Sequence, residues 1–179
     1  VMESGVTAIY HDPRRFGFVL PCPTDALNDH PLLAKMGPDP LDEQRFTSTT
    51  LHATLKSRKT SVKLAIMDQH VIAGMGNIYA SEALFQAGIH PERPACLLTQ
   101  KEANHLTSAV RAVLRAALAS GGSTLRDYVS GENVSGYFQH HFAVYDREDQ
   151  PCKKCIHSVK KLTQSGRATY YCGHCQPKK

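Results

Sequence analysis

The sequence lacks any hydrophobic run approaching the roughly 18 residues that a membrane-spanning helix needs, and it has no internal repeat and no low-complexity tract. These absences argue against a membrane-spanning protein, a repeat array and a disordered chain. Hydrophobic residues make up 41% and charged residues 21% of the 179 residues, as in ordinary globular proteins. No pattern typical of a secretory signal opens the sequence. We therefore expect a soluble, cytoplasmic protein.

Acidic residues are scarce in one part of the chain. Residues 147–179 contain eight basic residues against two acidic ones, whereas residues 1–146 are close to neutral. The basic residues are Arg147, Lys153, Lys154, Lys160, Lys161, Arg167, Lys178 and Lys179. A basic segment attached to a near-neutral body indicates a polyanionic partner. The alternative, a merely solubilising tail, is disfavoured because this segment has a folding signal of its own.

That signal is a set of four cysteines, Cys152, Cys155, Cys172 and Cys175, arranged as two Cys-x2-Cys pairs separated by sixteen residues. Without a secretory signal, this spacing indicates a metal site rather than disulfides. Four thiolates suit tetrahedral Zn²⁺ and leave no position open for water, so we expect one structural zinc ion. The segment between the pairs has a turn signal at residues 164–166 and is predicted to form a β-hairpin.

The hairpin also bears on what the metal site is for. A zinc site that serves stability alone remains an alternative. However, the hairpin contains Lys160, Lys161 and Arg167, whose charges fit contact with nucleic-acid phosphates.

Residues 4–20 contain β-rich runs on both sides of the polar segment DPRRFG, a pattern that predicts a strand, a turn and a second strand. The segment is similar to the end of a sheet whose other strands are missing. Residues 21–40 contain five of the ten prolines and are predicted to form a linker.

The remaining chain is mainly helical in pattern. Helices are predicted over residues 42–59, 61–69 and 78–87, and from Thr99 to the glycine pair at 121–122. Asn77 is the expected N-cap of the third helix, and Thr99 with Glu102 has the spacing of a capping box. In the last helix one apolar stripe is expected, formed by Leu106, Val110, Val113, Leu114, Ala117 and Leu118. Residues 123–136 are predicted to form a functional loop and residues 137–145 a strand.

Two further patterns suggest contact with DNA, each with an alternative. The glycine turn before residue 77 precedes a helix N-terminus, where free backbone N–H groups, Asn77 and Lys63 suit a phosphate. A plain helical hairpin explains that pattern about as well. In DPRRFG, Arg14 and Phe16 share one side of an extended strand and suit insertion into a base stack. In isolation, a salt-bridged turn with one core phenylalanine explains this segment better.

Taken together, the motifs resemble one family. DPRRFG, DQHVIAGMGNIYASEALFQAGIHP, GGSTLRDY, GYFQHHFAVYDR and the terminal YYCGHCQ occur in this order in formamidopyrimidine-DNA glycosylases. The resemblance runs over essentially the whole chain and corresponds to the C-terminal two-thirds of the family. The related endonuclease VIII branch shares the helix–two-turn–helix and the zinc finger, but GNIYASEALF and GIHP are nearer to the formamidopyrimidine branch.

The resemblance implies a fold and its domains. We expect a mainly α protein with small β elements, in which a helix–two-turn–helix domain is followed by a β-hairpin zinc finger. The expected domains are a remnant of a β-sandwich over residues 1–24, the helical DNA-binding domain over 25–145 and the four-cysteine finger over 146–179.

The resemblance also implies site residues. Arg14 faces the orphaned cytosine and Phe16 wedges the base stack, while Lys63, Asn77 and Arg167 contact phosphates. The loop over residues 123–136 closes on the extruded base, and its expected contact residues are Ser123, Thr124, Arg126 and Tyr128.

The implied function is base-excision repair of double-stranded DNA by a bacterial, nucleoid-associated, monomeric enzyme. The complete protein is expected to excise oxidised purines and to cut the strand through a Schiff base. The family's nucleophile is an N-terminal proline followed by a glutamate. The chain begins Val1-Met2-Glu3, and Glu3 matches neither residue, so we expect these 179 residues alone to be inactive. The alternative is a non-catalytic zinc-finger module that recognises damaged or bent DNA; a generic helix–turn–helix regulator is disfavoured because no recognition helix is evident.

Overall fold

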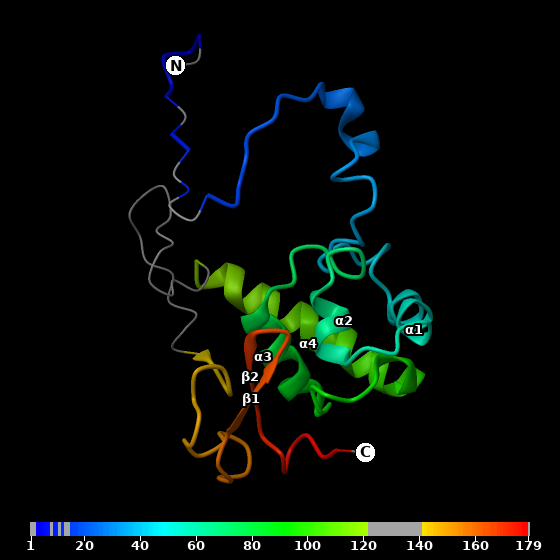
Figure 1. The fold of residues 1–179 in the computed structure, drawn as a ribbon, viewed down its shortest axis with the longest axis vertical. Coiled ribbons are helices and arrows are strands. Elements are labelled where there is room, and N and C mark those ends of the chain that lie inside the picture. The colour runs from blue at the N-terminus through cyan, green and yellow to red at the C-terminus, as the bar shows by residue number, and fades with distance from the viewer. Residues whose placement is uncertain (1–2, 8, 11, 13–14, 122–140, 179) are drawn as a thin grey trace. The chain divides into compact units, whose positions relative to one another are not determined.

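The computed structural model describes residues 3–7, 9–10, 12, 15–121 and 141–178. The chain divides into two compact units, Val1–Lys35 and Met36–Lys179, and each is described by itself (Figure 1). No helix in the described ranges is both long and apolar enough to cross a membrane.

Among its described residues, the first unit has one regular element, the 3-10 helix η1 (Thr24–Asp29), within the expected linker. The predicted turn is present: the Asp12 carboxylate accepts a 2.6 Å hydrogen bond from the Gly17 amide, and the Arg15 amide donates to the Asp12 carbonyl at 3.1 Å. The two predicted strands on either side are wrong for the residues described in this unit. A strand is stable only when a neighbour pairs with its backbone and covers one face, and here Ile9 and Val19 are 85% and 71% exposed.

The second unit begins with the short helices α1 (Ser48–Lys56) and α2 (Val62–Met67). Both are shorter than predicted, and local side chains explain why. Thr47 caps α1 and forms a reciprocal capping box with Thr50, which fixes the first turn there rather than at residue 42. Asp68 ends α2 because its carboxylate accepts the His70 amide at 2.9 Å and so favours a turn.

Helix α3 (Asn77–Ala87) follows a tight turn at Gly74, whose φ of 74° suits glycine. Its N-cap is Gly76, so the prediction of Asn77 as N-cap is wrong: Asn77 is the first helical residue and its side chain bonds elsewhere. The helix ends as predicted at Gly88, which is left-handed with φ 70°.

The longest helix, α4 (Gln100–Ala119), follows the 3-10 turn η2 (Ala95–Leu97). The predicted capping box of Thr99 and Glu102 is confirmed. Most of the predicted apolar stripe is buried, and Ala117 in the last turn still packs in the core, but its neighbour Leu118 is 67% exposed. The helix packs against α1 and α3. Each large side chain that is fully buried there contributes about 1.5–3 kcal/mol.

The finger contains a two-stranded antiparallel hairpin, β1 (Lys160–Gln164) and β2 (Arg167–Tyr171), as predicted. Ser165 and Gly166 form its turn with φ of 48° and 73°, the left-handed pair that a tight hairpin requires. A second small core joins this hairpin to α3 through Phe85, Val159 and Tyr170, and Figure 1 shows the hairpin (orange) beside α3. The strand predicted over residues 137–145 is wrong where the structure describes it: residues 141–145 form no strand, and the chain bends at 143–144 and turns at 145.

Candidate nucleic-acid interface and metal centre

The four predicted cysteine ligands meet at one point. Their sulfur atoms all lie within 4.8 Å of one another, with 3.9 Å between the Sγ atoms of Cys152 and Cys175 and 3.5 Å between those of Cys155 and Cys172. A tetrahedral zinc ion with Zn–S bonds of about 2.3 Å separates its sulfurs by about 3.8 Å. The spacing therefore fits one zinc ion.

The chemistry of the donor set agrees with this fit. Burial raises the pKa of the Cys175 thiol above its ordinary value, and its three sulfur neighbours raise it further. The four groups therefore do not all ionise together unless a cation compensates their charge. With four thiolates bound, zinc has no position left for water, so its role here is structural. It holds the two Cys-x2-Cys turns together at the base of the hairpin.

The hairpin presents cationic side chains at its surface. Lys160, Lys161 and Arg167 are all exposed. Lys161 pairs with Glu148 at 2.9 Å, and this contact raises the pKa of Lys161. Arg167 is the first residue of β2 and has an exposed side chain available for a phosphate.

The turn before α3 presents backbone to solvent. Gly74 and Gly76 are exposed, and Gly76 provides no side-chain cap to the first amides of the helix. Gln69 fixes the loop: its Oε1 accepts the Gly74 amide at 2.7 Å, and its Nε2 donates to the carbonyls of Met67 and Met75, each at 3.2 Å. A rigid turn before a helix N-terminus that has no side-chain cap is suited to an anion.

The ammonium group of Lys63 joins this turn to the hairpin. Its Nζ donates to Asn77 Oδ1 at 2.6 Å, to Thr169 Oγ1 at 2.6 Å and to the Ala168 carbonyl at 3.1 Å. Lys63 is 1% exposed. Burial and, to a smaller extent, the charge of Arg167 together lower the pKa of Lys63 to about 8. All three donors of Lys63 therefore serve the fold in this structure.

Asn77 completes the same junction. Its Nδ2 donates to the Ala168 carbonyl at 3.0 Å and to the Tyr145 hydroxyl at 3.3 Å. The predicted residues Lys63, Asn77 and Arg167 thus lie around one junction between α2, α3 and β2. Direct contact of each with phosphate stays a prediction.

Two glutamines, which the sequence reasoning missed, strengthen the attachment of the finger. Gln164 donates to Ser61 Oγ at 2.9 Å and accepts from the Thr169 hydroxyl at 3.0 Å. Gln176 is fully buried, accepts the Cys172 amide at 2.9 Å and donates to the Ile89 carbonyl at 2.8 Å. No spacing rule marks these residues, because the partners that attach them to the helical part, Ser61 and Ile89, lie far away along the chain.

A buried carboxylate, also missed, holds the chain where it enters the finger. Glu82 in α3 is 6% exposed and accepts three backbone amides: Ala143 at 2.9 Å, Val144 at 2.9 Å and Tyr145 at 2.8 Å. Charged acceptors make the stronger hydrogen bonds. Glu82 therefore stabilises residues 143–145 without a strand partner, which explains the bend and turn observed there.

The other predicted site residues belong to the first unit or lie outside the described residues. Phe16 lies in the first unit and is 78% exposed. Arg14 and the loop residues Ser123, Thr124, Arg126 and Tyr128 lie outside the described residues. Their roles stay predictions.

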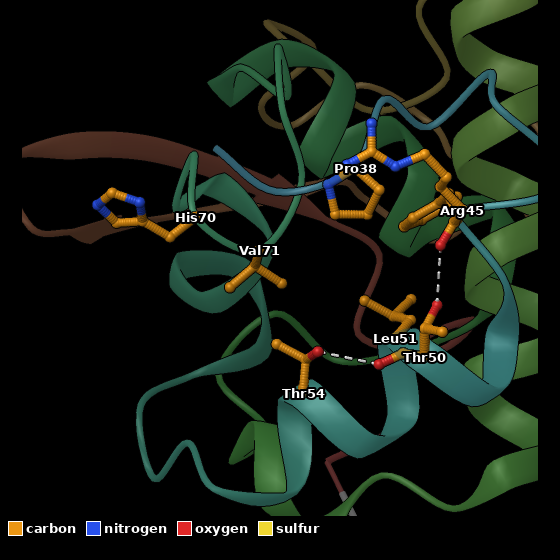
Figure 2. A pocket seen from close by; sticks show the side chains of 8 residues that line it. Pro38, Arg45, Thr50, Leu51, Thr54, His70 and Val71 are labelled. Atoms are coloured by element: carbon orange, nitrogen blue, oxygen red, sulfur yellow. Dashed lines mark hydrogen bonds between the residues drawn. The ribbon is translucent and has the colours of Figure 1, made fainter. Parts of the chain in front are cut away.

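A separate cavity of about 210 Å³ lies between α1 and the turn that follows α2 (Figure 2). The hydroxyl groups of two threonines in it serve the chain's own backbone: Thr50 donates to the Arg45 carbonyl at 3.3 Å, and Thr54 to the Thr50 carbonyl at 2.9 Å. Among the side chains drawn in Figure 2, no set of polar groups converges on a common point. The junction around Lys63 is the better candidate site.

Comparison with known proteins assigns both halves of the second unit. Residues 36–129 match the family described as "Formamidopyrimidine-DNA glycosylase H2TH domain", and residues 149–178 match "Zinc finger found in FPG and IleRS". A formamidopyrimidine-DNA glycosylase of Rhodospirillum rubrum is 48% identical over 180 residues, which cover 97% of this chain and 64% of the relative. One from Neisseria meningitidis is 49% identical over 176 residues, covering 98% of this chain and 63% of the relative. The chain thus spans slightly less than two thirds of the length of these relatives.

Solved structures agree. The MutM (Fpg) protein from Thermus thermophilus superposes with a TM-score of 0.87 at 42% identity, covering 94% of this chain and 64% of that chain. Lactococcus lactis Fpg in complex with DNA containing an abasic site superposes with a TM-score of 0.79 at 31% identity, covering 87% of this chain and 56% of that one.

Proposed function

The chain belongs to the formamidopyrimidine-DNA glycosylase family, and we propose that it serves base-excision repair by binding double-stranded DNA that contains oxidised purines. In the complete protein, this binding supports excision of the damaged base and cleavage of the strand at the resulting abasic site. The relatives carry the name of this glycosylase, and the related Lactococcus enzyme has been solved with DNA containing an abasic site.

The observation that carries the proposal is the junction of the two DNA-facing elements. Exposed Arg167, buried Lys63 and the uncapped first turn of α3 lie together, and hydrogen bonds through Thr169 and Asn77 fix their arrangement. Exposed Arg167 and the first turn of α3 suit adjacent phosphates of one strand, and the buried ammonium of Lys63, whose donors are used within the fold, adds positive charge beside them. Phosphate contacts do not depend on the base sequence, so the junction positions the duplex and does not recognise particular bases.

The remaining steps fall to residues outside this junction. Extruding a base costs a few kcal/mol of stacking and pairing. We propose that Arg14 and Phe16 offset this cost by filling the gap, and that residues 123–136 hold the extruded base. The zinc ion, when bound, holds the two cysteine turns and thereby the hairpin that carries Arg167.

We assign no catalytic residue within the 179 residues. We propose that they bind damaged DNA without cutting it, because none matches the proline and glutamate expected of the family. A non-catalytic module that recognises bent or damaged DNA has the same binding surface. DNA affinity therefore does not distinguish a repair enzyme from a non-catalytic binding module; only the chemical reaction of the complete protein does.

The test compares a duplex with one 8-oxoguanine opposite cytosine against the same duplex with guanine. Fluorescence anisotropy is expected to show tighter binding to the damaged duplex at fixed salt. Equal affinity for the damaged and the undamaged duplex would show that these residues do not recognise the lesion. Borohydride treatment of the complex is expected to trap no covalent adduct, and a trapped adduct would show that a nucleophile is present among these residues.

A further inference from the structure

A second group of metal-binding side chains lies beside the cysteine tetrad. His157, His174 and Cys155 each offer one ligand atom, and these atoms lie within 4.8 Å of one another. Both imidazoles are exposed and Cys155 is half-buried. We propose that the three side chains form an accessory site for a divalent transition-metal cation, which shares the Cys155 sulfur with the structural zinc.

The backbone fixes His157 at the edge of the finger. Its carbonyl accepts the Cys152 amide at 2.8 Å, and its own amide donates to the Cys155 carbonyl at 2.9 Å. The intervening Ile156 is left-handed, with φ 59°. The first Cys-x2-Cys turn therefore sets the position of His157, and the second sets that of His174, which directly precedes Cys175.

The orientation of the His157 ring suits a ligand. Its Nδ1 lies 3.1 Å from the Cys155 carbonyl, which can only accept a hydrogen bond, so Nδ1 is the donor and Nε2 is the nitrogen that is left for a cation. Metal-ligating histidines commonly donate their second N–H to a backbone carbonyl in this way.

The two rings already lie together. They stack with centroids 4.2 Å apart and planes 6° from parallel. A tetrahedral metal ion with metal–nitrogen bonds of about 2.0–2.1 Å requires its ligand nitrogens to lie about 3.4 Å apart. The ligand atoms here lie within 4.8 Å of one another. Binding therefore requires them to move closer by at most about 1.4 Å. The lone pairs of stacked rings lie in two parallel planes, so one ring must turn about χ2 before both nitrogens face the same ion. His157 is held by its Nδ1 contact with the Cys155 carbonyl, so this turn falls to His174, whose exposed ring has a broad χ2 torsion.

The donor set indicates the class of cation. Two imidazoles with a thiolate suit Zn²⁺, Ni²⁺ or Cu²⁺ and disfavour Mg²⁺ and Ca²⁺, which prefer oxygen. A thiolate bound to one zinc ion keeps lone pairs on sulfur and is able to bridge to a second metal.

The test is a titration of the zinc-loaded protein with Ni²⁺, in which calorimetry measures binding. Saturable binding of one Ni²⁺ is expected. His157→Ala and His174→Ala are each expected to weaken it by at least roughly tenfold, the lower bound for losing even a supporting partner of a ligand. His105→Ala, at an exposed position of α4, is the matched control and is expected to bind nickel as the parent does. Equal nickel affinity in the parent and both site variants would overturn the proposal.

Two further readouts examine the shared sulfur and competing explanations. X-ray absorption at the nickel edge is expected to show one sulfur with two imidazole nitrogens, and a nickel shell without sulfur would contradict the sharing. Zinc content is expected to remain constant; zinc release in proportion to bound nickel would mean replacement within the tetrad. If His157→Ala weakened DNA binding while leaving nickel binding intact, the stacked rings would be a nucleic-acid surface instead.

Discussion

Lys63 and Thr169 are 106 positions apart in the sequence, and the Lys63 ammonium donates a 2.6 Å hydrogen bond to the Thr169 hydroxyl. The Thr169 hydroxyl in turn donates a hydrogen bond to Gln164, and Gln164 donates one to Ser61. The zinc finger is thus attached to the N-terminal ends of α2 and α3 by a connected polar network.

The first prediction removes the middle of that network. Thr169→Val keeps the side-chain shape but removes the hydroxyl, leaving buried donors and acceptors without their partner. The free energy of unfolding is expected to fall by about 1–3 kcal/mol, measured by urea denaturation. Thr163→Val, at an exposed position of the neighbouring strand β1, is the control and is expected to change it little. If the two variants were equally stable, the network would not hold the finger.

The second prediction concerns pH. The pKa of Lys63 is about 8 in the folded protein against an ordinary 10.5. Between these values the unfolded chain binds more protons at this residue, so the contribution of Lys63 to stability rises with pH. The difference in unfolding free energy between the parent and Lys63→Met is therefore expected to shift in the parent's favour from about pH 7 to about pH 10. A difference independent of pH would contradict the lowered pKa.

The third prediction tests the phosphate contact. Arg167→Ala is expected to weaken DNA binding roughly tenfold to a hundredfold, which corresponds to one charge-assisted hydrogen-bonded contact. The slope of log affinity against log salt concentration should fall by the contribution of about one phosphate contact, and the preference for particular bases should stay unchanged. Anisotropy titrations at several salt concentrations measure both quantities. Arg115→Ala, which removes an exposed cation of α4 that pairs with Glu43, should leave affinity nearly as it was.

The fourth prediction addresses the metal. Cys172→Ser is expected to abolish stoichiometric zinc binding and to weaken DNA binding, because the hairpin loses its base. Most helical circular dichroism should persist, since the core of α1, α3 and α4 does not include the finger. Elemental analysis measures zinc, and equal zinc content in variant and parent would count against the site. Cys96→Ser, outside the tetrad, should retain zinc.

The fifth prediction concerns Glu82. In Glu82→Gln an amide NH₂ replaces one carboxylate oxygen and meets a backbone N–H of residues 143–145. The expected loss is about 1.5–3 kcal/mol of unfolding free energy. Glu43→Gln, at a 63% exposed side chain in a surface ion pair, should lose no more than about 1 kcal/mol. Thermal and urea denaturation measure both. Similar losses in the two variants would show that the three amide bonds do not depend on the charge.

The sequence predicted those features whose partners are close along the chain. The Thr99–Glu102 capping box, the left-handed Gly88 and the Ser165–Gly166 turn are all local, and all are confirmed. The cysteine spacing is nearly as local, because each pair supplies two ligands from one turn.

The features that escaped prediction depend on distant partners. Gln176 bonds to Ile89, 87 positions away, and no periodicity marks such a pair. Asn77 had the chemistry of an N-cap, but hydrogen bonding with Lys63 and Ala168 holds its side chain in another direction. The β-rich runs around DPRRFG have the composition of strands, but none of their described residues pairs with another strand, which a strand requires.

Helix α3 has a consequence for the evolution and engineering of this finger. Its first residue bonds to the hairpin, its middle holds the entry segment through Glu82, and Phe85 near its end completes the finger's small core. The cysteine module therefore depends on its contacts with α3 and is not interchangeable between scaffolds. On another scaffold the module would keep its four zinc ligands, but Arg167 would lose its orientation relative to the helical domain, because contacts with α3 set that orientation.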